Sequence, residues 1–177
     1  MSLTDLNVDQ ITASRDNLFT SVRLDRLAEL RDDPEWVENA LNSEAATLVP
    51  LWRSRCLLRQ HGDDTQPVYL TATDLDGIGE GAHLTLLGDD GRHTWFALAL
   101  NDAQRDRLLE KHPGAAFHDL RLTIDLDDRH AGVLAYARAL LYWHYRNAHC
   151  GFCGAPSRSS HVCETFGTIT CCSRATR

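Results

Sequence analysis

The longest regular pattern of apolar residues in this chain lies between residues 127 and 148. Apolar positions recur there at the three- and four-residue intervals of a single helical face. The residues on this face are Val133, Leu134, Ala137, Leu140, Leu141 and His144. The pattern predicts one long helix that begins at Asp127 or Asp128 and runs to about Ala148.

The N-terminal part predicts two shorter helices after an irregular arm over residues 1–23. Leu24, Leu27 and Leu30 are spaced for one helical face, which would end near residues 32–33. Asp33 is a good N-cap and Pro34 suits the first helical position, so a second helix is expected to start there.

Short apolar or alternating runs in the middle of the chain predict β-strands, because turn-rich pieces separate them. The runs are Thr47–Trp52, Cys56–Arg59, Val68–Ala72, His83–Leu87 and Trp95–Leu100. Gly88-Asp89-Asp90-Gly91 is a strong hairpin signal, since Asp-Gly tolerates the positive φ that such turns need. We expect an antiparallel meander with flanking helices, and hence an α+β fold.

Two further elements complete this prediction. Asn101 or Asp102 caps a helix to about Lys111, which Pro113-Gly114 stops. Residues 120–126 alternate as in a strand, although a loop lying along the core has the same pattern.

Composition limits the class of protein. A chain of 177 residues, 43% hydrophobic, can form one domain with a small appendage. The net charge of −7 argues against broad contact with a phosphate backbone, so nucleic acid is not an expected partner. The N-terminus shows neither a signal peptide nor a membrane anchor, which predicts a cytoplasmic protein with reduced cysteines.

Five of the six cysteines fall within the last 28 residues. Cys150 and Cys153 are separated by two residues, and Gly151 and Gly154 follow them. This spacing is typical of a zinc knuckle, in which the backbone doubles back and two thiolates face one metal ion. We therefore place a domain boundary near residue 148, between a globular domain (1–148) and a zinc-ribbon segment (149–177).

A structural zinc site needs two further ligands. Cys163 is the candidate for the third and Cys171 for the fourth; Cys172, His161 and His149 remain alternatives. A redox role is disfavoured, because catalytic cysteine pairs sit at helix N-termini, whereas this pair follows a helix C-terminus. Cys56 is expected to be a buried small hydrophobe and His144 a hydrogen-bonded structural histidine.

Several segments resemble the NADH pyrophosphatase family. They are Phe19-Thr20, Leu24–Arg31, Leu51-Trp52-Arg53, Leu57-Leu58 and, above all, Ala135–His144 leading into His149–Pro156. The resemblance implies a Nudix-like N-terminal domain without catalytic residues, a zinc ribbon, and a C-terminal Nudix hydrolase domain. It also implies a homodimer that cleaves NAD(H) to nicotinamide mononucleotide and AMP with Mg²⁺ or Mn²⁺, in some members on NAD-capped RNA.

This sequence departs from that family in its C-terminal part. A Nudix catalytic helix needs several glutamates to hold divalent ions, yet only Glu164 follows Cys153. The second cysteine pair is also irregular, as Phe166 stands three residues after Cys163. We expect no catalytic residues here and no NAD(H) hydrolysis by this chain alone. A truncated or frameshifted product and a natural ribbon variant both explain the tail, and a stand-alone zinc-binding adaptor is the alternative function.

Overall fold

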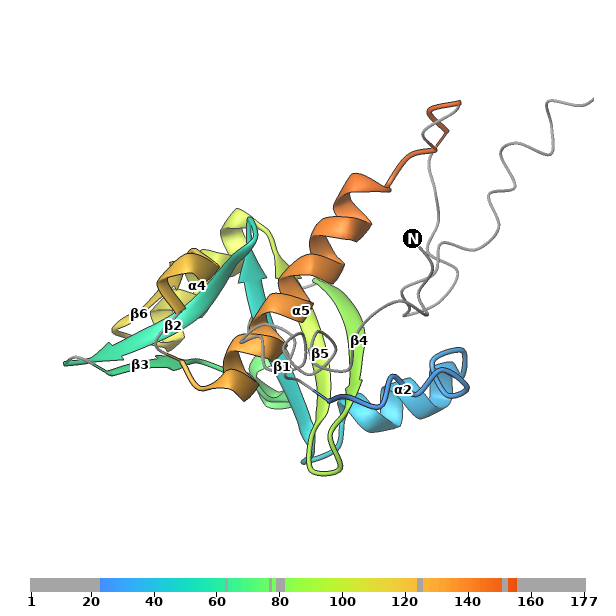
Figure 1. Ribbon diagram of the computed structural model, residues 1–177, viewed down its shortest axis with the longest axis horizontal. Helices are drawn as coiled ribbons and strands as arrows, with labels where there is room; N and C mark the ends of the chain where they lie inside the picture. The colour runs from blue at the N-terminus through green and yellow to red at the C-terminus, as the bar shows by residue number, and fades with distance from the viewer. Residues whose placement is uncertain are drawn as a thin grey trace, which may run out of the picture.

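The structure is a computed structural model that describes residues 23–62, 64–76, 78, 82–123, 126–150 and 153–155. Most of the predicted N-terminal arm therefore lies outside the described residues. A mixed β-sheet with helices on both faces forms the body of the molecule (Figure 1). In chain order the elements are α2 (Pro34–Leu41), β1 (Ala46–Trp52), β2 (Arg55–His61), β3 (Asp64–Pro67), α3 (Ala72–Leu75), β4 (His83–Asp89), β5 (Thr94–Leu100), α4 (Asp102–Lys111), β6 (Ala115–His118), the 3₁₀ turn η2 (Leu120–Thr123) and α5 (Asp128–Arg146).

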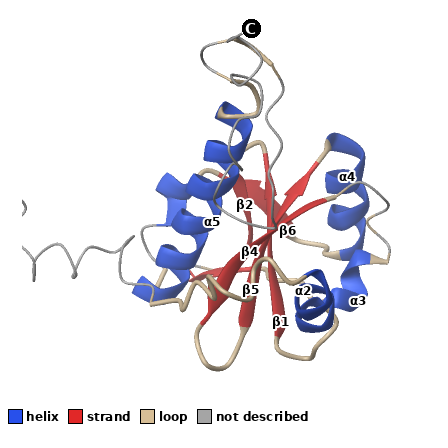
Figure 2. Cartoon of the chain, turned by 90° about the vertical axis from the view of Figure 1, so that its right-hand side faces the viewer, coloured by secondary structure: helices blue, strands red, loops and turns tan. Residues whose placement is uncertain are grey.

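The predicted α+β class with flanking helices is confirmed. Five strands of the six-stranded sheet follow the order β3-β2-β1-β5-β4. The sixth strand, β6, pairs with β2 outside this order. Figure 2 shows α5 over one face of this sheet and α2, α3 and α4 over the opposite face. No helix in the described ranges is both long and apolar enough to cross a membrane.

One detail of the predicted meander is wrong, because β1 and β5 pair in parallel from Ala46↔Thr94 to Trp52↔Leu100. Both strands are buried on both faces, as their burial along the chain shows. Such doubly covered strands are most stable at the centre of a sheet. The antiparallel β4–β5 hairpin consequently docks beside β1 as a unit, after a connection that contains α3.

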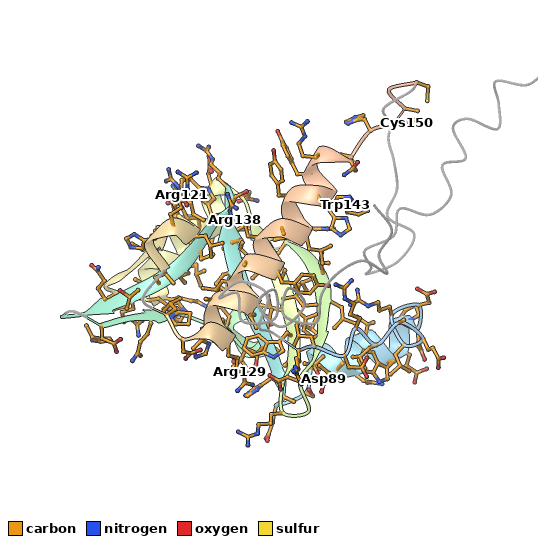
Figure 3. The ribbon with its side chains drawn as sticks, viewed as in Figure 1. Asp89, Arg121, Arg129, Arg138, Trp143 and Cys150 are labelled. Carbon is orange, nitrogen blue, oxygen red and sulfur yellow. The ribbon has the colours of Figure 1, made fainter. Side chains whose placement is uncertain are left out.

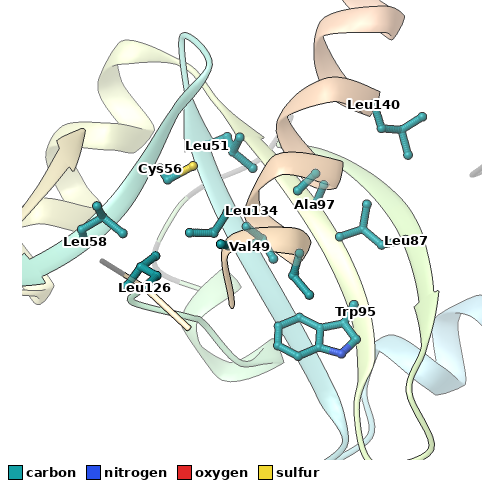
Figure 4. Close-up of a cluster of buried hydrophobic side chains, with 13 residues drawn as sticks. Val49, Leu51, Cys56, Leu58, Leu87, Trp95, Ala97, Leu126, Leu134 and Leu140 are labelled. Atoms are coloured by element: carbon teal, nitrogen blue, oxygen red, sulfur yellow. The ribbon is translucent and has the colours of Figure 1, made fainter. Parts of the chain in front are cut away.

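The alternation of side chains along the central strands creates two separate cores. Val49 and Leu51 of β1 and Trp95 and Ala97 of β5 face α5, where Leu134 packs against them (Figure 4). The alternate residues of the same strands face α2, α3 and α4. That second core contains Val37, Ala46, Leu48, Leu57, Leu70, Ile78, Leu86, Phe96, Leu98, Leu100 and Leu108.

The predicted helix boundaries are confirmed where local capping decides them. The Asp33 carboxylate accepts hydrogen bonds from the N–H groups of Glu35 (3.0 Å) and Trp36 (3.1 Å), which starts α2. Asn101 and Gln104 form a reciprocal capping box at α4. Asp127 caps α5, whose 19 residues match the predicted long helix within two residues at either end.

The helix predicted from Leu24, Leu27 and Leu30 is wrong. Successive turns occupy this stretch, with Leu27 at a positive φ of 53°. Leu24 packs against the core under α5, whereas Leu27 packs against the opposite core. The segment thus crosses the edge of the sheet, so that its leucines reach both cores. A single helical face could not bury them in this way, and the helix predicted from their spacing does not form.

The strand pattern also shifts in two places. The strand predicted at Val68–Ala72 is replaced by β3, which pairs with β2 directly after the Gly62 turn, and only Leu70 forms an isolated bridge, to Leu48. Residues 120–123 form η2 rather than a strand, and Leu126 is buried under α5. The short strand β6 was not predicted, because Ala115–His118 lacks a strong alternating pattern.

The turn between β4 and β5 holds the predicted hairpin together through Asp90. Its carboxylate accepts hydrogen bonds from the Trp95 indole (2.8 Å), from the backbone N–H groups of Arg92 and His93 (both 2.9 Å) and from the Arg129 guanidinium. Burial alone would raise the pKa of Asp90, but these donors outweigh it and hold the pKa far below its usual range.

Replacing Asp90 with asparagine is expected to lower the free energy of unfolding by about 1–3 kcal/mol at pH 7. A carboxylate with a depressed folded-state pKa stabilises the fold above its unfolded pKa of about 3.9, and this contribution disappears as the pH falls. The difference between wild type and Asp90→Asn should therefore shrink below about pH 4. Urea denaturation at pH 7, 5 and 3 measures it, with exposed Glu38→Gln as the control. A difference that does not change with pH would contradict the role given to the carboxylate charge.

Candidate functional site

The C-terminal end of α5 carries the predicted cysteine pair away from the sheet (Figure 3). After Arg146 the chain turns back on itself, since the Cys150 N–H donates to the Ala155 carbonyl and the Gly154 N–H to the Cys150 carbonyl, both at 2.8 Å. Gly154 has a φ of +69°, which only glycine adopts without strain. This reversal is the backbone shape that the cysteine spacing predicts for a zinc knuckle.

The two cysteines differ in accessibility, because Cys150 is buried and Cys153 is exposed. Within the described residues no group of three or more His, Cys, Asp or Glu side chains is arranged to hold a metal ion. The other predicted ligands, Cys163 and Cys171, and the alternatives Cys172 and His161 lie outside those residues. His149 is described and exposed. The donor chemistry and the chain reversal at Cys150 fit half of a four-ligand zinc site.

Cys56 is buried in the core under α5, as predicted (Figure 4). Burial raises the pKa of its thiol to about 12, although the charge of Arg138 opposes this. The thiol is therefore protonated at neutral pH, and the apolar core encloses it.

His144 lies on α5 in edge-on ring contact with His83 of β4 and with Trp143. Burial, followed by the nearby charge of His83, lowers the pKa of His144. The position agrees with a structural histidine, whose neutral ring packs between the helix and the sheet.

A polar hollow of about 550 Å³ near the start of α5 is lined by Tyr69, Asp127 and His130, among others. The Tyr69 hydroxyl lies 2.8 Å from Nδ1 of His130. Burial raises the pKa of Tyr69 well above its usual value, so the phenol in this hydrogen bond stays protonated. This contact fixes the first turn of α5 against the segment after β3.

A second hollow, of about 510 Å³, lies between the β1–β2 turn and the last turns of α5. We call it the arginine–tyrosine hollow, and its lining includes Leu51, Arg53, Arg138, Leu141, Tyr142 and Tyr145. Arg138 reaches across it, donating from Nε to the Ser54 carbonyl at 3.0 Å. Sequence reasoning missed this site. The available signal was the spacing of Arg138, Tyr142 and Tyr145, which puts three polar-tipped side chains on one helical face.

The comparison with known families agrees with this architecture. A family described as NADH pyrophosphatase-like rudimentary NUDIX domain matches residues 45–143, from the start of β1 almost to the end of α5. The chain belongs to this family. The resemblance inferred from the helix that leads into the cysteine pair is thereby confirmed.

Individual relatives of this rudimentary NUDIX protein are more distant. The human NAD-capped RNA hydrolase NUDT12 is 25% identical in an alignment 172 positions long, which covers 78% of this chain and 37% of NUDT12. The proteins of the same name from Macaca fascicularis and Pongo abelii are each 24% identical, with the same coverage. The chain thus spans little more than a third of the length of these relatives.

The glutamates of this rudimentary NUDIX domain are dispersed. Glu29 and Glu44 lie in turns, Glu35 and Glu38 on α2, and Glu110 on α4. In the described part of the chain they form no carboxylate cluster that could hold a divalent ion. The two remaining features of interest are the chain reversal at Cys150, after the end of α5, and the arginine–tyrosine hollow along α5.

Proposed function

We propose that this chain is the non-catalytic module of an NAD(H) pyrophosphatase-type protein and that it holds a structural zinc ion. The family match over residues 45–143 carries this proposal, because the matched region ends in the helix that delivers Cys150. The relatives are NAD-capped RNA hydrolases, which supports a dinucleotide-related role for the whole assembly.

The zinc ion would be held by Cys150 and Cys153, with Cys163 and Cys171 completing the set. Zinc bound by four thiolates is closed to substrate and supplies folding energy rather than catalysis. In this role it would fix the chain reversal at residues 150–155 and so determine the direction in which the following residues leave α5. Mg²⁺ or Mn²⁺ would act only at the carboxylates of a catalytic Nudix domain.

A homodimer is the second part of the proposal. Trp143 is 39% exposed on the last turns of α5 and has a large apolar surface outside both cores. Exposed tryptophans are enriched where protein surfaces meet. The same observation supports the alternative of a stand-alone zinc-binding adaptor, in which a different protein covers this surface.

Native mass spectrometry of protein purified without added metal tests the proposal. We expect a dimer with one zinc ion per chain and no release of nicotinamide mononucleotide from NADH in the presence of Mg²⁺ or Mn²⁺. A chain that holds no zinc would contradict the metal assignment. Hydrolysis of NADH by the pure protein would contradict the non-catalytic role, and a zinc-loaded monomer would favour the adaptor.

A further inference from the structure

The arginine–tyrosine hollow combines an apolar floor with two exposed phenol rings. Leu51 and Leu141 form part of the floor, while Tyr142 and Tyr145 stand at the rim with 51% and 78% of their surfaces exposed. Its volume of about 510 Å³ lies within the range of small-molecule sites, roughly 300–1,000 Å³. Exposed rings of this kind can stack on the face of a planar ligand.

Arginines surround the same end of the molecule. Arg53, Arg55 and Arg105 lie over the Trp52 ring, at 4.9, 5.6 and 4.4 Å from its centre. The charges of Arg138, Arg121 and Arg55 all act on the carboxylate of Asp119. The backbone N–H of Arg121 and these three charges lower the pKa of Asp119, so this carboxylate stays ionised.

These arginines outnumber the carboxylates beside them. Asp102 pairs with Arg53 at 2.8 Å, and Asp106 with Arg105 at 2.5 Å. Within the described residues no carboxylate forms an ion pair with Arg55, Arg121 or Arg138. Although the chain carries a net charge of −7, the charged residues that line this hollow are Arg53 and Arg138, which suits an anion.

The turn that forms one wall of the hollow is strained. Arg53 and Ser54 both have positive φ, 48° and 63°, in a two-residue hairpin turn where Asn-Gly is favoured. Each such residue costs about 1 kcal/mol or more. The contacts of Arg53 with Trp52 and Asp102 offset part of this cost. The Ser54 carbonyl receives Arg138 from across the hollow. Strain held in place by surrounding contacts is a feature of ligand sites.

We propose that the arginine–tyrosine hollow binds a nucleoside 5′-phosphate, with its base against Tyr142 and Tyr145 and its phosphate against Arg138. An aromatic, anionic ligand fits because the rings offer stacking and the guanidinium groups offer charge-assisted hydrogen bonds in the same cavity. A free nucleotide and the end of a single-stranded RNA share this chemistry. The site contains neither Cys150 nor Cys153 and stands independently of zinc binding.

Isothermal titration of the full-length chain with AMP, with a five-nucleotide oligoadenylate and with inorganic phosphate tests the proposal. AMP should bind, and Tyr145→Ala should lower the affinity for AMP about tenfold, because stacking on one base is lost. Arg138→Gln should lower the affinity for AMP by a similar factor. Tyr145 is largely exposed, so its replacement leaves the fold intact even if Arg138→Gln lowers stability.

Arg92→Gln is the matched control, since it removes the same charge from the exposed β4–β5 turn at the opposite end of the sheet. It should leave the affinity unchanged. If oligoadenylate binds more tightly than AMP and with a steeper salt dependence, the ligand is an RNA end. If the two affinities are equal, the ligand is a free nucleotide.

Three outcomes would overturn the proposal. The folded chain could fail to bind both AMP and oligoadenylate. It could bind inorganic phosphate as well as AMP with no effect of Tyr145→Ala. Finally, Tyr145→Ala could abolish dimerisation without any nucleotide binding, which would make this surface a protein interface.

Discussion

Replacing Cys150 with serine is expected to weaken zinc binding more than about 100-fold while leaving the domain folded. Loss of one thiolate removes a large share of a metal-binding free energy that is on the order of 10 kcal/mol or more for structural zinc. Neither core contains Cys150, so the free energy of unfolding of the sheet and its helices should hardly change. Competition with a chromogenic chelator measures the affinity, and urea denaturation of the same samples measures the stability.

Cys56→Ser is the control, and it should lower the stability of the fold without changing the zinc affinity. A hydroxyl group at this fully buried position lies in an apolar cluster, which lowers the free energy of unfolding by about 1–3 kcal/mol. Zinc affinity should be unchanged, because Cys56 is enclosed in the apolar core and is not among the predicted ligands. If Cys150→Ser still held zinc as tightly as wild type, Cys150 would not be a ligand.

Replacing Gly88 with alanine is expected to cost about 2–4 kcal/mol of unfolding free energy. Gly88 has a φ of +147°, and an added Cβ would lie 2.3 Å from the backbone oxygen of Asp25. This close contact would push the two backbone segments apart and break the two hydrogen bonds that join Asp25 to Asp89, each 2.8 Å long. The segment before α2 would then lose its attachment to β4.

Gly91→Ala isolates the contribution of backbone strain, because Gly91 also has a positive φ (+85°) but no atom within 4 Å of an added Cβ. It should cost only about 1 kcal/mol. Chemical denaturation gives both values. Hydrogen exchange at the Asp25 and Asp89 amides should show lost protection in Gly88→Ala alone. Equal costs for the two variants would mean that the packing of residues 24–25 on β4 contributes little.

The attachment of this N-terminal segment shows where sequence reasoning reached its limit. Arg31 is buried, and its Nη2 donates to the Leu87 carbonyl at 2.9 Å, which anchors the turns after Leu27 on the sheet edge. The leucine spacing predicted a helix here, since spacing cannot reveal that Leu24 and Leu27 pack into different cores. A buried arginine that bonds a distant carbonyl leaves no periodic signal.

The candidate site also has one part with a local signal in the sequence and one part that depends on tertiary packing. The spacing of Cys150 and Cys153 predicted a local chain reversal, and the structure joins residues 150 and 155 by a backbone hydrogen bond. Zinc binding by Cys150 and Cys153 stays a prediction, as do the two further ligands. The arginine–tyrosine hollow was not readable, because residues 53 and 138 meet only after β1 and α5 have packed.

The elements whose signals are local could be predicted from the amino-acid sequence. These are the long helix α5, the capped starts of α2 and α4, the hairpin at Asp90 and the family resemblance around Cys150. Hydrogen bonds and periodic burial within a few residues decide such features. The packed fold was needed to reveal the parallel pairing of β1 with β5, the crossing of the sheet edge near Asp25 and the hollow beside α5. Each of these depends on which surfaces remain to be buried once the other elements have formed, and that is a property of the whole fold.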